Sequence, residues 1–348
     1  MTDRSVTARG AVRIAICVNP MSGRDVRRIA ARATNMTHEA KRDIVARVAA
    51  GAHATGATDI YVAKEPFRIA SLALQHLGLD ARVHVLDPPI TNTAADTEAA
   101  IAGYLAAGCT TIVSLGGDGT NRAIARALLE AGTAAAGVSL IPLSTGTNNV
   151  FPVLAEPTIA GMVAGLLAAG KLDAAELGRR AKLLHVGGSD ASGAPVADVG
   201  LIDAVLLRRD YIGNLLPFDA ARIDRILLTR AEPTAVGMSP IGGLLEVVDA
   251  ADDEGLLVEM GAGVEFSAPL SPGSFQTVSV SSITRIPIDV PVPFRGPGVL
   301  ALDGDRDHKL AANGGLTVRI RRDGPNIVDL DAAMRWAVGR GIIAPSFK

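Results

Sequence analysis

The chain has 348 residues and a formal net charge of −2, and 48% of its residues are hydrophobic. This length exceeds what a single hydrophobic core usually supports, so we expect two domains. A nearly neutral chain lacks the basic face that duplex nucleic acid or an anionic membrane would require, which argues against both as partners. Every long apolar stretch is interrupted before the length of about 18 residues that a membrane span requires.

The cysteines and the N-terminus indicate a cytoplasmic location. Cys17 and Cys109 each border an apolar run, so we expect two buried thiols and no disulfide. Residues 1–20 contain a short apolar run that ends in Asn-Pro, which is typical of a first strand and not of a secretory signal. The expected partners are small molecules, and a homo-oligomer is expected.

The first half of the chain alternates short β-rich runs with longer Ala-rich runs of helical period. We expect strands at 12–18, 59–63, 82–86, 110–115 and 138–142, and helices at 38–55, 67–77, 94–107, 121–131 and 157–169. This alternation is typical of parallel βαβ units. It predicts a doubly wound, Rossmann-like α/β domain over residues 1–172.

The second half has a different pattern. From about residue 180, strand-like segments are separated by Gly, Pro and Asp, and helical runs are few. Closely spaced segments of this kind predict an all-β, sandwich-like domain over residues 173–348. A final amphipathic helix is expected at about 329–338. The overall prediction is an α/β domain followed by a β-sandwich.

A glycine-rich turn, Gly116 to Thr120, follows the predicted strand 110–115 and precedes a helix. Its three glycines allow a phosphate to approach the backbone, and Thr120 or Asn121 is expected to cap the helix, whose N-terminus attracts anions. Asp118 would repel a phosphate unless it binds a cation or accepts a proton. The turn therefore predicts magnesium binding or deprotonation of a hydroxyl by Asp118. A tight turn with an Asp cap is the simpler alternative.

Two more loops should lie at the same sheet edge. Asn19-Pro20 ends the first strand, and Ser22-Gly23-Arg24 is expected to open a helix, although a plain strand-to-helix turn would have the same sequence. The loop 142–152 follows the fifth strand and is rich in hydroxyl and amide side chains. This density suits ribose, phosphate or adenine contacts, but a solvated loop could also have it.

Three acidic residues stand out in the second half. Asp203 lies within an apolar strand, either on the solvent face or as a ligand-binding group between the domains. Asp303 and Asp305 flank Gly304 at the end of another strand. Asp-Gly is a strong hairpin signal, so a turn explains this pair as well as a site does.

These motifs together resemble the NAD kinase / diacylglycerol kinase superfamily, and in particular its acetoin-catabolism protein X branch. The segments Asn19 to Gly23, Gly116 to Thr120, Gly146 to Asn149 and Asp303 to Asp305 occur in the family's order. The resemblance implies an active site between the domains, ATP and Mg²⁺ as cofactors, and NAD as the acceptor. The implied reaction is phosphoryl transfer from ATP to the 2′-hydroxyl of the NAD adenosine ribose.

The resemblance also implies roles for individual residues. Asp118 is the catalytic residue and a possible Mg²⁺ ligand, and Asp303 is a weaker Mg²⁺ candidate. Phosphate or nucleotide binding falls to Asn19, Ser22, Gly23, Gly116, Gly117, Gly119, Thr120, Thr145, Gly146 and Thr147. The acceptor is expected to contact Asn148, Asn149 and Asp203.

The sequence departs from both kinase groups. NAD kinases carry an Asn-acid pair where this chain has Ile202-Asp203, and their Gly-Ser-Thr-Ala-Tyr segment is replaced by residues 236–240. Lipid kinases carry Asn-Glu where this chain has Arg122-Ala123, and their Asp-Gly-Glu motif would make Asp305 an alternative base. A nucleotide-binding regulator without catalysis, possibly linked to acetoin catabolism, and a lipid kinase therefore stay as alternative functions.

Overall fold

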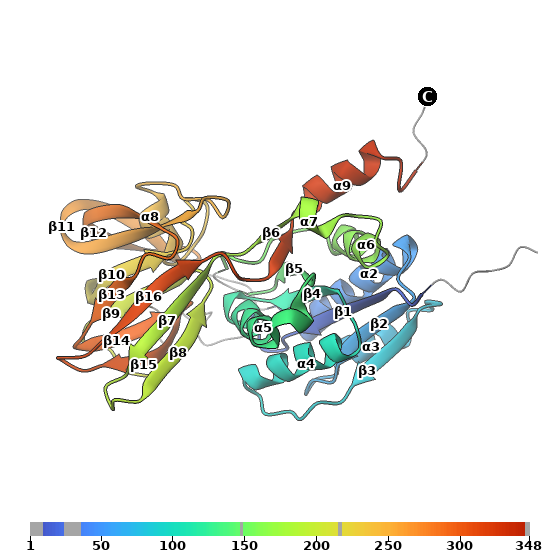
Figure 1. The fold of residues 1–348 in the computed structure, drawn as a ribbon, viewed down its shortest axis with the longest axis horizontal. Coiled ribbons are helices and arrows are strands. Elements are labelled where there is room, and N and C mark those ends of the chain that lie inside the picture. Colours follow the sequence, from blue (N-terminus) through green and yellow to red (C-terminus); the bar gives the residue numbers. More distant parts are fainter. Residues whose placement is uncertain (1–9, 24–35, 147–148, 215–217, 345–348) are drawn as a thin grey trace, which may run out of the picture.

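The computed structural model of the protein describes residues 10–23, 36–146, 149–214 and 218–344 (Figure 1). Five parallel strands form most of a seven-stranded sheet. In sheet order they are β3 (Arg82–Leu86), β2 (Asp59–Ala63), β1 (Arg13–Val18), β4 (Thr111–Gly116) and β5 (Ser139–Ser144). All of β4 is buried, as expected for a central strand that is covered on both faces.

Helices cover both faces of this sheet. They are α2 (His38–Thr55), α3 (Ile69–Gln75), α4 (Ala94–Ala106), α5 (Asp118–Ala131) and α6 (Pro157–Ala168), with a 3₁₀ turn η1 (Gly132–Ala135) after α5. Successive residues of β1 alternate between the two cores: Ile14 packs with α2, α3 and α6, whereas Ala15 packs with α4 and α5. This alternation follows from the two-residue period of a strand.

The Ala- and Gly-rich composition of α2 and α6 lets these helices approach closely. A Cβ added at Gly161 would lie 2.1 Å from the Val48 carbonyl oxygen, and one at Gly51 would lie 2.1 Å from the Thr158 carbonyl oxygen. No side chain fits at either position. The helix pair therefore depends on glycine for its backbone contact.

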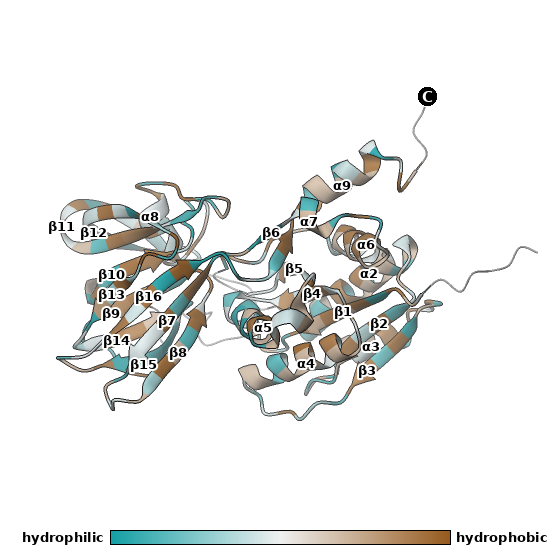
Figure 2. Cartoon of the chain, viewed as in Figure 1, coloured by the Kyte–Doolittle hydropathy of each residue, from teal (hydrophilic) through white to brown (hydrophobic). Residues whose placement is uncertain are grey.

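Two antiparallel sheets follow in the second half, and hydrophobic side chains pack between them (Figures 1 and 2). The six-stranded sheet has the order β12 (Ser274–Pro287), β11 (Glu254–Ser271), β10 (Ile223–Leu228), β9 (Asp203–Leu207), β14 (Gly298–Leu302) and β15 (Asp305–Leu310). The four-stranded sheet has the order β13 (Val292–Arg295), β16 (Gly315–Arg321), β7 (Leu183–Ser189) and β8 (Pro195–Gly200). A 3₁₀ turn η2 (Ala220–Arg222) and a short helix α8 (Ser239–Gly243) lie in the connections.

The chain crosses between the two halves twice, at neighbouring positions. After the short helix α7 (Ala174–Leu177), strand β6 (Gly178–Arg180) leaves the first sheet, and β17 (Asn326–Val328) returns to it. Strand β17 pairs in parallel with β5 and antiparallel with β6. The last helix α9 (Leu330–Gly339) contributes Ala333 and Ala337 to the core beneath α2 and α6.

The structure confirms the predicted fold class, a parallel α/β sheet followed by antiparallel sheets. The division at residue 172 stays a prediction. One expected detail is wrong: α5 begins at Asp118, inside the glycine turn, and its cap residue Gly117 offers no side chain, so Thr120 and Asn121 do not cap it. Among the described residues, no helix is both long and apolar enough to cross a membrane.

Candidate functional site

The candidate site lies where the order of the parallel strands reverses. Strands β1 and β4 are neighbours, yet the chain leaves them toward opposite sides of the sheet, and such a switch point opens a crevice at the carboxyl ends of the strands. Here the Asn19 amide donates to the Leu115 carbonyl at 3.0 Å. The Asn19 side chain donates to the Thr120 hydroxyl at 2.8 Å. Two predicted motifs therefore touch.

The Asn19–Gly23 loop is closed by its own side chains. The Asn19 carboxamide oxygen accepts the N–H groups of Met21 and Ser22 at 2.9 and 3.2 Å. The Ser22 hydroxyl hydrogen-bonds to that of Thr145 at 2.7 Å, which joins the loop to the end of β5. Gly23 has a φ of 73°, a conformation that glycine adopts without strain. The helix expected from Arg24 lies outside the described residues.

Lys41 on α2, which the sequence did not indicate, is buried against this loop and binds its carbonyl groups. The Lys41 side chain on α2 has no exposed surface, and its ammonium donates to the carbonyls of Asn19, Pro20 and Ser22 at 2.8, 2.8 and 2.7 Å. A charged group can be buried when its donors are satisfied in this way. Lys41 thereby fixes the shape of the loop without lining the cavity.

The glycine turn is shaped by two side chains that pack against it. A Cβ at Gly116 would lie 2.4 Å from the Thr120 Cβ, and one at Gly117 would lie 2.7 Å from the Asn149 carboxamide oxygen. A side chain at position 116 would clash with Thr120, and one at position 117 would displace the Asn149 carboxamide. Asn121 is buried and accepts a hydrogen bond from the Ser114 hydroxyl at 2.7 Å, which ties the first turn of α5 to β4.

Asp118 lies in the first turn of α5. Its Oδ1 accepts the Phe151 N–H at 2.9 Å, and its Oδ2 accepts the Val150 N–H at 3.1 Å. Burial, followed by repulsion from Asp303, raises the pKa of Asp118 from 3.8 to about 7, although both amides and Arg230 act in the opposite direction. A carboxyl group in this state can hold or release a proton near neutral pH.

The Asp303-Gly304-Asp305 segment forms the turn between β14 and β15, as a hairpin would. Asp303 and Gly304 have φ angles of 51° and 92°, which is typical of a two-residue type I′ turn. The Asp303 carboxylate accepts the amides of residues 201–203 at 2.7, 2.7 and 3.2 Å. Burial raises its pKa, against the effect of Arg122 and these amides. The turn is thus also part of the site.

These elements enclose a cavity of about 650 Å³. Most of the predicted site residues line it: Asn19, Ser22, Gly23, Gly117, Asp118, Gly119, Thr120, Gly146, Asn149, Asp303 and Asp305. Gly116 and Thr145 are buried behind this wall, and Asp203 does not line the cavity either. Thr147 and Asn148 lie outside the described residues.

The predicted acceptor residues in the second half are arranged differently from the kinase pattern. Asp203 is 8% exposed at the start of β9, so it is not on the solvent face. Ile202 has no exposed surface and packs in the core below α4 and α5. Ser239, in the altered 236–240 segment, is buried and donates to the Arg230 carbonyl at 2.9 Å. None of the three side chains lines the cavity.

The opposite end of the cavity contains polar residues that sequence reasoning missed: Lys64, Glu65, Asn92, Thr93, Asp96 and Thr97. Lys64 and Glu65 follow β2, and the other four lie just before α4 or in its first turn. No glycine-rich motif marks them. Asp96 accepts the amides of Thr91 and Asn92 at 2.6 and 2.8 Å, so its charge supports the loop. Lys64 pairs with exposed Asp87 at 2.9 Å.

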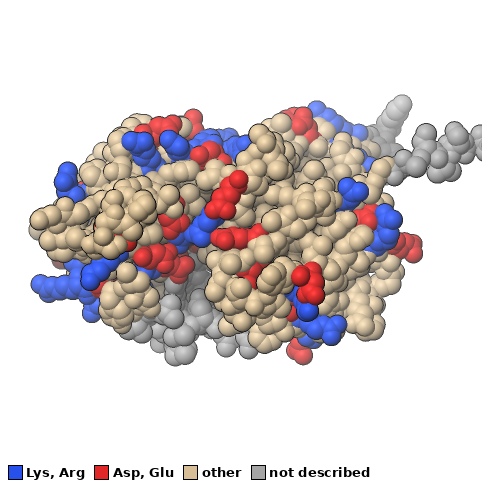
Figure 3. Space-filling model, turned by 60° about the horizontal axis from the view of Figure 1, so that its bottom comes forward, with Lys and Arg blue, Asp and Glu red and all other residues tan. Residues whose placement is uncertain are grey.

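Acidic groups outnumber basic ones in the cavity. Among the described lining residues, five are acidic and only Lys64 is a lysine or arginine. Figure 3 shows acidic and basic side chains mixed along the groove between the two halves. Asp118 and Asp303 are both half-buried, and their charges repel each other. Two carboxylates of this kind fit Mg²⁺, which is commonly bound by one or two carboxylates together with substrate phosphates.

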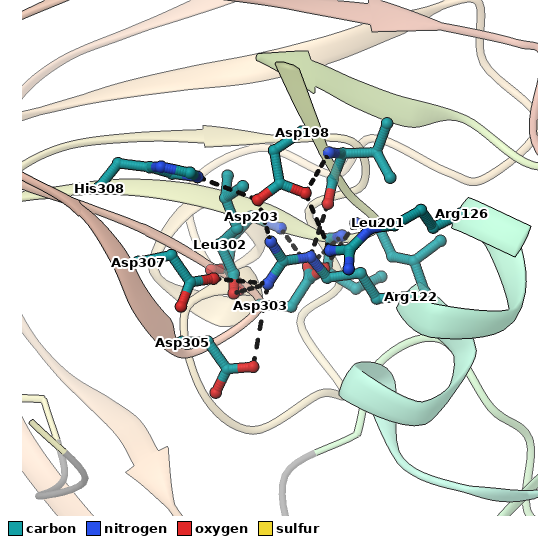
Figure 4. A network of polar contacts seen from close by, with 12 residues as sticks. Arg122, Arg126, Asp198, Leu201, Asp203, Leu302, Asp303, Asp305, Asp307 and His308 are labelled. Atoms are coloured by element: carbon teal, nitrogen blue, oxygen red, sulfur yellow. Dashed lines mark hydrogen bonds and ion pairs between the residues drawn. The ribbon is translucent and has the colours of Figure 1, made fainter. Parts of the chain in front are cut away.

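Beside the cavity, ion pairs connect α5 to the antiparallel sheets (Figure 4). Asp198, Asp307 and His308 are close enough to bind a metal ion together. However, Arg122 contacts Asp198 at 2.7 Å and Asp307 at 3.2 Å. A guanidinium already balances these carboxylates, so this cluster is an ion-pair network.

Comparisons with known proteins agree with this architecture. The family model of the diacylglycerol kinase catalytic domain matches residues 13–179, and that of the acetoin catabolism protein X C-terminal domain matches residues 182–323. The crystal structure of yeast NADH kinase complexed with NADH aligns with 97% of this chain and 89% of its own, with a TM-score of 0.52 and 13% identity. At that identity the alignment shows a shared fold.

The first half of the chain thus matches a diacylglycerol kinase catalytic domain, and the whole chain has the fold of NADH kinase. Acetoin catabolism protein X from Cupriavidus necator is 33% identical over 337 residues, which cover 93% of this chain and 92% of that protein. The chain belongs to the acetoin catabolism protein X family. The resemblance inferred from the sequence motifs is confirmed.

Proposed function

We propose that this protein transfers the γ-phosphoryl group of ATP to a hydroxyl group of a nucleotide-like acceptor, with NAD as the leading candidate. The observation that carries this proposal is Asp118, a half-buried carboxyl at the cavity wall and at the N-terminus of α5. The bond between the γ-phosphorus and its bridging oxygen breaks, and the acceptor oxygen bonds to the phosphorus. The hydroxyl proton passes to Asp118, and ADP leaves.

Asp118 is suited to this proton transfer by its environment. A general base works best when its pKa lies near the working pH, and the pKa of Asp118 is about 7. The Val150 and Phe151 amides hold the carboxylate in one orientation. General-base catalysis of this kind typically contributes about 10²- to 10⁴-fold to the rate.

The wall around Asp118 also suits the phosphate groups. Gly117 and Gly119 leave the backbone accessible, the N-terminus of α5 favours anions, and Asn19 and Thr120 supply polar side chains. The predicted contact by Thr147 belongs to the same proposal. Mg²⁺, held by Asp303 together with the substrate phosphates, would neutralise phosphate charge in an otherwise acidic cavity. Asp118 as a Mg²⁺ ligand is the alternative to its role as the base.

Fewer described residues are available to contact the acceptor than to contact the phosphate groups. Asn149 lines the cavity beside Gly117, and it is the described side chain best placed for an acceptor or an adenosine. Asn148 is proposed with it. Asp203 lies outside the cavity wall, so its proposed contact with the acceptor is the weakest assignment.

The burial of Ile202 supports a second candidate function. Ile202 is part of the hydrophobic core, where NAD kinases carry an amide that holds the dinucleotide. A nucleotide-binding regulator that has lost catalysis, possibly in acetoin catabolism, would tolerate this change. It would bind ATP without turnover of any acceptor.

The test is incubation of the protein with ATP, Mg²⁺ and NAD, with NADP measured enzymatically. We expect turnover by the wild type and a decrease of about 10²- to 10⁴-fold for Asp118→Asn. Asp190→Asn, on the exposed β7–β8 turn, is the matched control. Equal rates for wild type and Asp118→Asn would rule out the role given to Asp118.

If NADP does not form, ATP consumption with a panel of other hydroxyl compounds separates a different acceptor from a regulator. If ATP is consumed with one of these compounds, the protein is a kinase and that compound is its acceptor in place of NAD. ATP binding by calorimetry, without consumption on any compound, would support the regulator.

A further inference from the structure

Arg122 is the charged side chain that joins the two halves of the protein beside the cavity. It lies one helical turn after Asp118 on α5, so both side chains project from the same face of the helix. The Arg122 side chain is 4% exposed, which is low for an arginine. Such burial requires that its donors are satisfied by the surrounding groups.

The partners of Arg122 all belong to the second half of the chain (Figure 4). Its guanidinium donates to the Val199 carbonyl at 2.6 Å, the Asp198 carboxylate at 2.7 Å, the Asp307 carboxylate at 3.2 Å and the Leu302 carbonyl at 3.3 Å. Asp305 lies 3.9 Å away as an ion pair. A planar guanidinium offers five donors in a fixed geometry, whereas a lysine ammonium offers three.

These contacts surround the Asp303 turn. Leu302 immediately precedes Asp303, and Val199 precedes the segment 201–203, whose amides Asp303 accepts. Arg122 therefore contacts the chain on both sides of the interaction that fixes the Asp303 carboxylate. The turn also approaches α5 at its end, where the Asp305 Oδ2 lies 4.0 Å from the position of a Cβ on Gly119.

The placement of Asp303 needs such support because it is electrostatically unfavourable. Asp303 and Asp118 are half-buried carboxyls that repel each other, so the turn would be more stable farther from α5 without a compensating cation. Arg122 provides positive charge next to Asp303. Leaving a buried charge without its partner is strongly destabilising.

Arg126 belongs to the same network but has a different position. It contacts Asp198 at 2.9 Å and Glu98 at 3.1 Å, and its side chain is 31% exposed. His308 also contacts Asp198, at 3.0 Å. None of the hydrogen bonds or ion pairs of Arg126 reaches Asp303 or Asp305. Arg126 is therefore a natural control for Arg122.

We propose that Arg122 is a positioning residue that holds the Asp303–Asp305 turn of the second half against the first turn of α5. The carboxylates of Asp303 and Asp118 then meet at one wall of the cavity. Arg122 touches neither the acceptor nor the phosphates and acts through the turn. The catalytic part of this inference rests on the proposed phosphoryl transfer, whereas the structural part does not.

The test compares Arg122→Gln, Arg122→Lys and Arg126→Gln with the wild type. Hydrogen exchange of the amides of residues 201–203 reports whether Asp303 still accepts them. We expect exchange at least about tenfold faster in Arg122→Gln, an intermediate value in Arg122→Lys, and the wild-type value in Arg126→Gln. Circular dichroism establishes that each variant folds. If Arg122→Gln does not fold, the comparison is made with Arg122→Lys.

Steady-state kinetics with ATP and the acceptor found above provide the second measurement. We expect kcat to fall about tenfold to 100-fold in Arg122→Gln, because a shift of about 1 Å at a reacting group can cost that much. The KM for ATP should stay within about twofold, since the Asn19–Gly23 loop and the glycine turn are unchanged. A residue that only stabilised the fold would reduce the amount of folded protein and leave kcat per folded molecule unchanged.

The two measurements separate the possible failures. Unchanged exchange at residues 201–203 in a folded Arg122→Gln variant would overturn the proposal, whatever the kinetics. Faster exchange with unchanged kcat would also overturn it, because the turn would then not position the reaction. If the wild type transfers no phosphoryl group, the proposed function fails, and exchange alone decides whether Arg122 holds the turn.

Discussion

The two walls of the cavity contribute opposite kinds of side chain. The edge of the parallel sheet provides glycines, hydroxyls and amides, among them Gly117, Thr120 and Asn19. The antiparallel half provides the carboxylates of Asp303 and Asp305. Outside the cavity, the buried Ile202 stands where the resemblance to NAD kinases places an Asn. The division between the walls is thus one of uncharged hydrogen-bonding groups against carboxylates, with a hydrophobe in place of the expected amide.

The largest expected effect concerns Ile202. If its burial excludes the NAD kinase mode of acceptor binding, Ile202→Asn should not create a dinucleotide site. It should instead place an amide in the core and reduce the free energy of unfolding by about 4 kcal/mol. Urea denaturation and NAD titration by calorimetry measure both effects, with Ile202→Val, expected to cost about 1 kcal/mol, as the control. Tighter NAD binding by Ile202→Asn would contradict the division between the walls.

The next effect concerns Lys41 below the phosphate wall. Lys41→Met removes an ammonium that three loop carbonyls accept, so we expect a loss of about 3 kcal/mol in unfolding free energy and weaker ATP binding. Lys171→Met is the control, because Lys171 is exposed and donates to a single carbonyl, that of Thr55. If both variants had the same stability and ATP affinity as the wild type, the loop would not depend on Lys41.

The next prediction concerns the pH dependence of stability, which tests the raised pKa of Asp118. Because the pKa of Asp118 is raised to about 7 on folding, its contribution to stability is complete below the unfolded pKa near 3.8 and is lost as the pH rises through 7. Asp118→Asn should therefore gain about 2 kcal/mol relative to the wild type between pH 5 and pH 8. Denaturation curves at both pH values measure this difference, and a constant difference would mean that Asp118 is ionised throughout.

The smallest expected effect decides between the two candidate bases. Asp305 is 48% exposed at its side chain and interacts with Arg122 only at 3.9 Å. Asp305→Asn should lower kcat by less than about tenfold, well below the decrease expected for Asp118→Asn. Measured side by side, decreases of equal size would instead assign the proton transfer to Asp305, as the resemblance to lipid kinases implies.

Much of the first half could be predicted from the sequence because its signals are local. Residues 110–115 are β-branched or apolar except for Ser114, and the glycines that follow mark the passage from β4 to α5. The strand and the start of the helix could therefore be predicted together. The hairpin at Asp303-Gly304 is equally local. In the same way, the order of the motifs along the chain was enough to identify the superfamily.

The remaining site features depend on contacts between distant segments. Lys41 has the sequence context of a solvated helix residue and is buried only because the Asn19–Ser22 carbonyls turn toward it. Arg122 has partners 76 to 185 residues away. Asp203 is buried near the turn that begins at Asp303, which no local pattern indicates. Such positions become visible only when the sheets are assembled.

Strands β6 and β17 have a mechanical consequence for the cavity. They are the two crossings between the halves, and they are paired with each other: Ala181 N–H donates to the Pro325 carbonyl at 2.8 Å, and Gly324 N–H donates to the Ala181 carbonyl at 3.0 Å. A rotation of one half about the axis of these crossings would shear this pairing, whereas a bending motion would preserve it. The double connection therefore resists twisting of one half against the other, which keeps the Asp303–Asp305 turn aligned with the first turn of α5.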